Sequence, residues 1–493
     1  MAEQKEYRNI FKSTFLFGFV QIFNIAVKVG LNKIVALLLG TEGMGAISLY
    51  NTTIHLVSVG AGLGVSQSAV RDISDARGSN KNQRLDITIS FVKKIIRYTS
   101  LLGIVAMAAL SPWLSEWTFG TRNYTLSYLL LSLATGATIQ TNGYRAINTG
   151  MRELRNVAMS TIWGSVVGLV SAIPLYFILG ERGIVPSLII SSITTLLIAK
   201  YYADKVKHKL IKMSLTETIR QSSDMIKMGI SLMLMSFMLT GTQLIVSSYI
   251  SSHGGLSIVG IYQAGATIVT SYFGIIISAM STEYYPRISS FHTNNQKLHD
   301  AVNSQSEIGL LLSMPLMVVF VFLAKYFILF LYSDKFLSAT SYLDYAVLGT
   351  IAIICSNPMG MILLAKQNRK LFLMASLIGD VLTIIINILL FNYLGLKGLG
   401  IAYMINGIKQ FIMYDYIMYS NYNIHFNWRI ILSLIGLYGL CALASGIRSI
   451  EMDSIRWLCG IGLFCISGWI SFSQLNERMG IDVLQLIIKR IKR

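Results

Sequence analysis

Charged residues are scarce in this chain, and so are cysteines and prolines. Asp, Glu, Lys and Arg make up 13% of the 493 residues, which is about half the share in a typical soluble domain. The four cysteines all lie in apolar stretches, which argues against a disulfide framework, a metal cluster or a catalytic thiol. The sequence also lacks Walker, HExxH and GxSxG motifs and clustered carboxylates outside the apolar stretches. We therefore expect no catalytic residues, no metal ligands, no cofactor and no ATP-driven step.

Hydrophobic residues dominate the chain instead, at 54% with a mean hydropathy of +0.59. A membrane-spanning helix needs about 20 largely apolar residues. The sequence predicts an all-α polytopic membrane protein with about 14 transmembrane helices and no cleavable signal peptide. We place the spans at 11–39, 44–70, 88–111, 124–147, 157–180, 183–203, 225–250, 258–283, 308–332, 343–365, 371–394, 398–420, 428–446 and 455–475. Lys93, Lys94 and Arg97 are expected in an amphipathic entry to the third span.

Basic residues are distributed unevenly between the loops. The net charge is +18, and Lys and Arg are concentrated in alternate loops and in both terminal segments. This pattern follows the positive-inside rule and places both termini in the cytoplasm. Because the basic residues sit in short loops between apolar spans, they indicate membrane topology and not a nucleic-acid partner.

The two halves of the chain are weakly alike at an offset of 215 residues, which brings Gly45 onto Gly260, Gly180 onto Gly395 and Gly183 onto Gly398. An offset one residue longer brings Arg71 onto Arg287. Six spans in each half give two parallel repeats, with a substrate site expected between them near the membrane midplane. The predicted parts are an N-lobe (1–203), a basic cytoplasmic linker (204–224), a C-lobe (225–420), and two further spans with a basic tail (421–493).

The first apolar stretch, from Phe11 to Leu39, carries two lysines inside a predicted span. A lysine at the bilayer centre costs at least about 2.5 kcal/mol, so it normally faces a partner or a water-filled cavity. Lys28 shares one helical face with three amides. We interpret this helix as one wall of a cationic cavity; the alternative is that the lysines pair with carboxylates or extend to the interface. The candidate binding residues are Gln21, Asn24, Lys28, Asn32 and Lys33, with Lys409 in support.

Asp380 and Lys409 lie inside two consecutive predicted spans, where the first half of the chain has Ser165 and Thr194. They either form a direct ion pair or serve in coupling, with Asp380 exchanging H⁺ or Na⁺ and releasing Lys409 in one state. A second polar stripe consists of small and polar residues on one face of the second span. Such stripes more often pack helices together, and we expect a helix contact from its members Asn51, His55, Ser58, Gly62 and Ser66.

The segment KIVALLLGTEGMGA, which begins at Lys33, and Tyr50 after it resemble the first-hairpin pattern of polysaccharide-transport flippases. The turns GERGI (180–184) and GLKGLG (395–400) recur at the matching place in that family. Over roughly the first 420 residues the chain thus resembles the O-antigen translocase (Wzx-like) branch of the multidrug/oligosaccharidyl-lipid/polysaccharide (MOP) exporter superfamily. The resemblance implies two six-helix lobes in a V shape around a cationic cavity. Family members usually have twelve spans, whereas lipid II flippases have fourteen.

The resemblance also implies a function, which is flipping of a polyprenyl-pyrophosphate-linked oligosaccharide to the outer leaflet by alternating access. H⁺ or Na⁺ is the candidate coupling ion. A lipid II-type flippase and a cation-coupled multidrug exporter are the alternatives; a glycosyltransferase would need a large outer loop, which we do not predict. The expected location is the inner (cytoplasmic) membrane. The expected partners are membrane lipids and the polysaccharide polymerase and chain-length machinery, with the chain itself a monomer.

Overall fold

The computed structural model describes residues 23–78, 82–206, 223–366 and 368–479, and this part of the chain folds into helices joined by short turns. The described residues contain no strand, in agreement with the predicted all-α class. The chain divides into two compact units. Unit 1 comprises Met1–Gly260 with Leu331–Ser333, and unit 2 comprises Ile261–Phe330 with Asp334–Arg493. The predicted domain boundaries stay a prediction, and most of the predicted linker lies outside the described residues.

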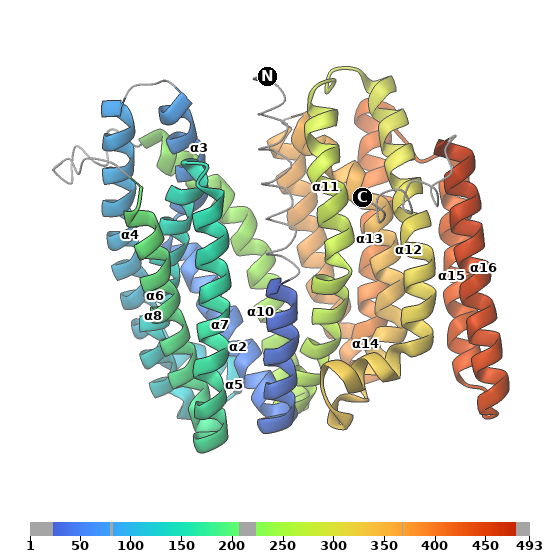
Figure 1. The fold of residues 1–493 in the computed structure, drawn as a ribbon, viewed down its shortest axis with the longest axis horizontal. Coiled ribbons are helices and arrows are strands. Elements are labelled where there is room, and N and C mark those ends of the chain that lie inside the picture. The colour runs from blue at the N-terminus through green and yellow to red at the C-terminus, as the bar shows by residue number, and fades with distance from the viewer. Residues whose placement is uncertain (1–22, 79–81, 207–222, 367, 480–493) are drawn as a thin grey trace. The chain divides into compact units, whose positions relative to one another are not determined.

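Each unit is a bundle of long helices (Figure 1). Unit 1 contains a helix over residues 23–38, followed by α2 (Gly40–Ala61), α3 (Val65–Gly78), α4 (Asn82–Ala109), α5 (Ser111–Phe119), α6 (Thr125–Gly150), α7 (Leu154–Leu179), α8 (Ile184–Asp204) and most of α10 (Ser223–Thr267). Unit 2 contains the π-helix η3 (Ile268–Tyr272), α11 (Gly274–Ser289), α12 (Asn295–Leu331), α13 (Ala339–Ala365), α14 (Arg369–Tyr422), α15 (Trp428–Arg448) and α16 (Asp453–Met479).

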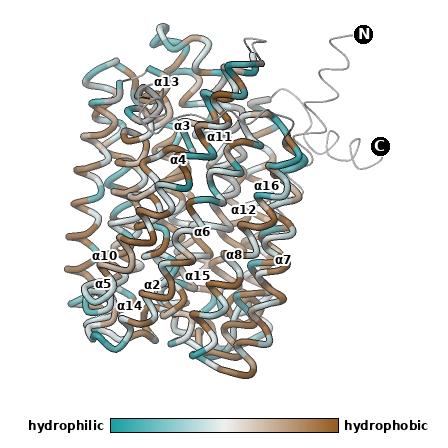
Figure 2. The backbone as a smooth tube through the Cα atoms, turned by 90° about the vertical axis from the view of Figure 1, so that its left-hand side faces the viewer, coloured by the Kyte–Doolittle hydropathy of each residue, from teal (hydrophilic) through white to brown (hydrophobic). Residues whose placement is uncertain are grey.

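The surface and the length of these helices suit a lipid bilayer. Large apolar side chains face outward, among them Phe177, Tyr393 and Trp469 at 77%, 82% and 73% exposure. Figure 2 shows hydrophobic colour along much of the helical path and hydrophilic stretches toward its ends. In the described part, seven helical stretches are long and apolar enough to cross a membrane, or eight if the bent pair α4–α5 is one span. The chain is therefore a multi-pass membrane protein.

Three of these seven stretches each cover two predicted spans. They run over Leu154–Asp204, Lys227–Ser271 and Lys370–Tyr422, and at 45 to 53 residues each exceeds the length needed for one crossing. Each is interrupted by a residue with non-helical backbone angles, at Gly180, Gly255 and Gly395. The predicted spans 11–39, 44–70 and 124–147 are also helical where described, but they are more polar and fall outside the seven.

Two predicted span boundaries were wrong. The span predicted at 44–70 ends at Ala61, because the chain breaks at Gly62–Gly64 and restarts as α3. The basic residues Lys93, Lys94 and Arg97 do not form a separate entry helix but lie within the continuous helix α4. Lys93 is buried there because its Nζ donates to Asp204 Oδ1 on α8 at 2.7 Å, which provides the charge partner that burial requires.

The predicted parallel repeat is visible in the backbone. Helices α7 and α8 pack along each other and are joined by a turn at Gly180, with φ 56° and ψ −134°. Helix α14 turns at Gly395, 215 residues later, with φ 57° and ψ −136°. The residues before the two hairpins agree as well, since Glu153 has φ −81° and ψ 64° and Asn368 has φ −81° and ψ 72°. Positive φ favours glycine at both turns.

A π-helical turn explains why the offset between the halves grows by one residue along the chain. The offset is 215 from Gly45 to Gly260 and 216 from Arg71 to Arg287. The π-helix η3 lies between Gly260 and Arg287, and the Phe273 N–H donates to the Ile268 carbonyl five residues earlier at 3.4 Å. A π turn accommodates an extra residue within a helix, so the second half absorbs its insertion there.

Two glycines that correspond in the repeat also touch each other. A Cβ built on Gly45 would lie 2.2 Å from the Leu256 carbonyl oxygen, and one built on Gly260 would lie 1.9 Å from the Thr41 carbonyl oxygen. Thr41 and Leu256 are themselves 215 residues apart. The contact is therefore reciprocal, as in an interface with two-fold symmetry, and it lets α2 and the last turns of α10 approach backbone to backbone.

Candidate functional site

A polar pocket of about 420 Å³ lies within unit 1, where α2, α3, α6 and α10 meet. Polar side chains make up most of its wall, and apolar ones contribute Val59, Val70, Ala146 and Met233. The polar lining residues are His55, Ser58, Ser66, Gln67, Asn142, Arg145, Thr149 and Ser236. This mixture of one cation, two amides and several hydroxyls can bind a polar or anionic group.

The break between α2 and α3 shapes one wall of this pocket. Leu63 and Gly64 both have positive φ, at 50° and 62°, which is unusual for leucine and indicates local strain. A Cβ on Gly64 would lie 1.9 Å from the Gly229 carbonyl oxygen, so α10 passes directly against the break. The break thereby turns the start of α3 into the wall and places Ser66 and Gln67 beside α10.

Arg145 is the charged residue of the pocket and comes from the last turns of α6. Its side chain is half-buried, and its Nε is buried without a hydrogen-bond partner. In the described residues its guanidinium forms no ion pair or hydrogen bond with the protein. A buried cation is costly unless an anion or acceptors compensate it. Because a guanidinium binds phosphates through paired donors, this site favours an anionic ligand.

His55 lines the pocket from α2 and is hydrogen-bonded to α10. Its Nδ1 lies 3.2 Å from Thr240 Oγ1, and the Thr240 hydroxyl donates to the Ser236 carbonyl at 2.8 Å. The polar stripe of the second span was expected to pack helices. Four of its members, His55, Ser58, Gly62 and Ser66, instead line the pocket.

The predicted cationic face of the first helix is not part of this pocket. Lys28 is exposed, and the Lys33 ammonium donates to the Tyr332 carbonyl. Asn24 Oδ1 accepts a hydrogen bond from Ser165 Oγ on α7 at 3.0 Å. Asn32 is half-buried, and Gln21 lies outside the described residues. The binding roles proposed for these five residues stay predictions.

The second predicted site has a different arrangement from the ion pair that we considered. Lys409 Nζ donates to the Gly379 carbonyl at 2.7 Å, to Thr383 Oγ1 at 2.9 Å and to Asn406 Oδ1 at 3.0 Å. Asp380 and Lys409 are both described, and no ion pair within 4.0 Å joins them. Neutral acceptors within the α14 hairpin therefore compensate the Lys409 charge, and the half-buried Asp380 carboxylate remains available for another role.

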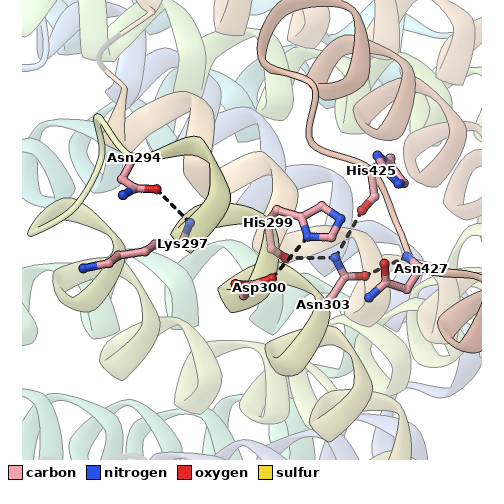
Figure 3. Close-up of polar contacts among 7 residues, drawn as sticks. All are labelled: Asn294, Lys297, His299, Asp300, Asn303, His425 and Asn427. Carbon is pink, nitrogen blue, oxygen red and sulfur yellow. Dashed lines mark hydrogen bonds and ion pairs between the residues drawn. The ribbon is translucent and has the colours of Figure 1, made fainter.

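A further polar cluster in unit 2 fixes the connection between α14 and α15 to the start of α12 (Figure 3). The Asn303 amide donates to the carbonyls of His299 and His425 at 2.8 and 3.1 Å and accepts from the Asn427 N–H at 2.8 Å. The His299 and His425 rings meet edge to face at 5.0 Å. Because the side chain of Asn303 is fully occupied by backbone groups, we interpret this cluster as structural.

Sequence reasoning assigned Arg145 to the basic loops that set topology and so missed its place in the pocket. A signal was present, because Asn142, Arg145 and Thr149 follow the three- and four-residue spacing of one helix face. The polar stripe on the second span gave the facing wall. Neither stripe alone indicates a site, because the break at Gly62–Gly64 and the approach of α10 bring them together.

Comparison with known proteins places this fold among transporters. Residues 34–341, more than half of the chain, match the family model described as "Polysaccharide biosynthesis protein". The lipid III flippase of Escherichia coli (strain K12) is 20% identical over 395 residues, covering 78% of this chain and 93% of the relative. The lipid III flippase of Shigella flexneri matches equally.

Two solved structures share the fold at low sequence identity. The lipid II flippase MurJ in its inward closed conformation has a TM-score of 0.71 at 16% identity, over 94% of this chain and 99% of that one. An inward-facing multidrug resistance transporter of the MATE family, in the MOP superfamily, has a TM-score of 0.65 at 15% identity, over 85% and 96% of the two chains. The fold is therefore that of MOP-superfamily transporters.

Proposed function

Because this chain belongs to the polysaccharide biosynthesis protein family, we propose that it is a flippase for a lipid-linked oligosaccharide. The substrate class is a polyprenyl-pyrophosphate-linked repeat unit of an O-antigen or a related polysaccharide, moved from the cytoplasmic to the outer leaflet. The two curated relatives are lipid III flippases, and the fold is shared with a lipid II flippase, which supports a lipid-linked substrate. The proposal makes the protein a transporter and not an enzyme.

One observation carries this proposal, and it is the uncompensated Arg145 guanidinium in a polar pocket of unit 1. Attraction between a cation and a pyrophosphate is much stronger in a protein interior than in water, because the effective dielectric constant is lower. The amides and hydroxyls of Gln67, Asn142 and Ser236 supply the donors and acceptors that a sugar or phosphate needs. In this proposal Arg145 binds the pyrophosphate.

Residues outside the pocket have supporting roles in the proposal. Lys28 is exposed and can attract the head group as it enters, and Asp380 is the candidate for exchange of H⁺ or Na⁺. Lys409 keeps Asp380 in a polar environment through the bonds that it makes within α14. Both termini are proposed to face the cytoplasm in the inner membrane, where the polysaccharide polymerase could receive the flipped unit.

A lipid II-type substrate is the second candidate. The observation that favours it is the helix pair α15 and α16, which extends the chain beyond two sets of six spans, together with the coverage of 99% of the lipid II flippase structure. A multidrug exporter fits less well, because a pocket containing an unpaired arginine repels cationic drugs.

Precursor accumulation in a strain that lacks the gene distinguishes these candidates. Lipid extracts from such a strain should contain an excess of the oligosaccharide linked to polyprenyl pyrophosphate, and surface polysaccharide should be lost. Accumulation of the peptidoglycan precursor would support the lipid II alternative. Normal levels of both precursors together with new drug sensitivity would contradict the flippase proposal.

A further inference from the structure

The hydrogen bond of His55 determines which of its ring nitrogens carries the proton. The Thr240 hydroxyl has one proton, which it donates to the Ser236 carbonyl at 2.8 Å. Toward His55 Nδ1, at 3.2 Å, the same hydroxyl therefore accepts. The neutral ring thus carries its proton on Nδ1, and Nε2 is left as an acceptor. His55 Nε2 has no hydrogen-bond partner among the described residues, and the side chain lines the pocket.

We propose that His55 takes up a proton on Nε2 when an anion enters the pocket, so that the proton and the anion bind together. The proton comes from water, the Nδ1–H bond to Thr240 stays in place, and no bond in the ligand breaks. The new Nε2–H becomes a charge-assisted donor beside the Arg145 site. The identity of the anion as a lipid pyrophosphate rests on the proposed function, whereas the co-binding applies to any dianion.

The charges around His55 favour this coupling. Arg145 on α6 is the charged residue among those that line the pocket, and a cation disfavours protonation of the ring while the pocket is empty. Helix α4 carries no titratable side chain over residues 99–109, and α10 carries none over 228–248. On α3, Ser66 and Gln67 line the pocket and are uncharged. An entering dianion therefore reverses the local charge, and protonation becomes favourable.

The consequence for transport is a smaller net charge on the occupied pocket. Arg145 and a protonated His55 together compensate the two negative charges of a dianion, whereas Arg145 alone leaves one uncompensated. Since uncompensated charge is costly inside a membrane protein, the doubly occupied pocket is the form best suited to a conformational change. Occupancy by substrate is thereby linked to the proton concentration on the side from which the pocket is open.

Sulfate is a suitable probe because it keeps two charges across the pH range in which histidine titrates. We would measure sulfate binding by calorimetry at pH 5.5 and 7.5, using the full chain in lipid nanodiscs. The wild type should bind about tenfold more tightly at pH 5.5, because the protonated fraction of an ordinary histidine changes by about that factor. His55→Gln should bind equally at both pH values and match the wild type at pH 7.5. His253→Gln is the control, because His253 is exposed and lies outside the pocket.

Each contrary result overturns a different part of the proposal. If His55→Gln keeps the tenfold pH effect, the proton site is not His55. If the wild type binds equally at both pH values while Arg145→Gln abolishes binding, co-binding is wrong and the anion site stands. If Arg145→Gln leaves sulfate affinity unchanged, the anion site itself is wrong. The flippase proposal is tested separately, by precursor accumulation, and does not depend on sulfate binding.

Discussion

The hairpins α7–α8 and α14 share a backbone but differ in their polar chemistry. Gly180 and Gly395 turn the two hairpins with nearly the same φ and ψ angles. Where the first hairpin has Ser165 and Thr194, the second has Asp380 and Lys409. Ser165 bonds outward to Asn24, whereas Lys409 bonds across its own hairpin to Gly379, Thr383 and Asn406. The repeat has kept its geometry while its side chains have taken different roles.

The pocket shows the same divergence in the opposite direction. The offset that relates Asn148 to Leu363 also relates Arg145 to Gly360. In unit 2 the Tyr414 ring occupies this place, 2.9 Å from where a Cβ on Gly360 would lie. One half has a cation beside an open pocket, and the other half has a packed aromatic ring. The anion site should therefore belong to the first half alone, and the following variants test this asymmetry.

The largest effect is expected for Arg145→Gln, which removes the charge from the pocket. A hydrogen bond to a charged group contributes about 1.5–3 kcal/mol, so anion affinity should fall about 10- to 100-fold. Sulfate or pyrophosphate calorimetry measures this change directly. Arg155→Gln is the matched control, since Arg155 is exposed and lies outside the pocket. Equal losses in both variants would indicate a general electrostatic effect and not a site.

The next effect is expected at the reciprocal glycine contact. Gly45→Ala and Gly260→Ala each place a methyl group within 2.2 Å of a carbonyl oxygen. Because backbone must move to relieve this clash, each substitution should cost about 1–3 kcal/mol, visible as a lower unfolding temperature in detergent. Gly436→Ala is the control, because nothing lies within 4 Å of its Cβ position. A control as unstable as the two variants would refute the contact.

Lys409→Ala should destabilise the second hairpin more than the equivalent change destabilises the first. It removes three hydrogen bonds within α14, for an expected cost of about 1–3 kcal/mol. Thr194→Ala removes a bond to the Ile190 carbonyl of its own helix and should change stability by less than about 0.5 kcal/mol. Similar unfolding temperatures for the two variants would show that Lys409 does not stabilise the hairpin.

The smallest change in stability is expected for Asp380→Asn, at less than about 0.5 kcal/mol, because no ion pair joins Asp380 to Lys409. Transport, in contrast, should be impaired if Asp380 exchanges the coupling ion. Unfolding temperature and transport are therefore measured on the same preparation. A loss of stability as large as that of Lys409→Ala would favour the ion pair after all.

The fold could be predicted from the sequence because its main signals are local. Apolar stretches of span length, the alternation of basic loops and the recurring glycine turns each depend on neighbouring residues, and they gave the helical class and the repeat. The break at Gly62–Gly64 was missed because two glycines and a leucine in an apolar stretch do not differ in composition from a packed helix.

The pocket could not be predicted in the same way, because it depends on contacts between distant segments. The lysines of the first helix formed the strongest polar pattern, yet Lys33 donates to a carbonyl and Lys28 is exposed. Arg145 was counted among the loop cations because the sequence does not show that α6 continues past it to Gly150. Burial of the guanidinium beside α10 depends on tertiary packing.

The central claim is tested most directly by precursor accumulation in a strain that lacks the gene and carries either the wild type or Arg145→Gln, at equal amounts in the membrane. The wild type should restore surface polysaccharide and remove the accumulated lipid-linked oligosaccharide. Arg145→Gln should leave the precursor accumulated, while Arg155→Gln should behave as the wild type. Full restoration by Arg145→Gln would contradict the account.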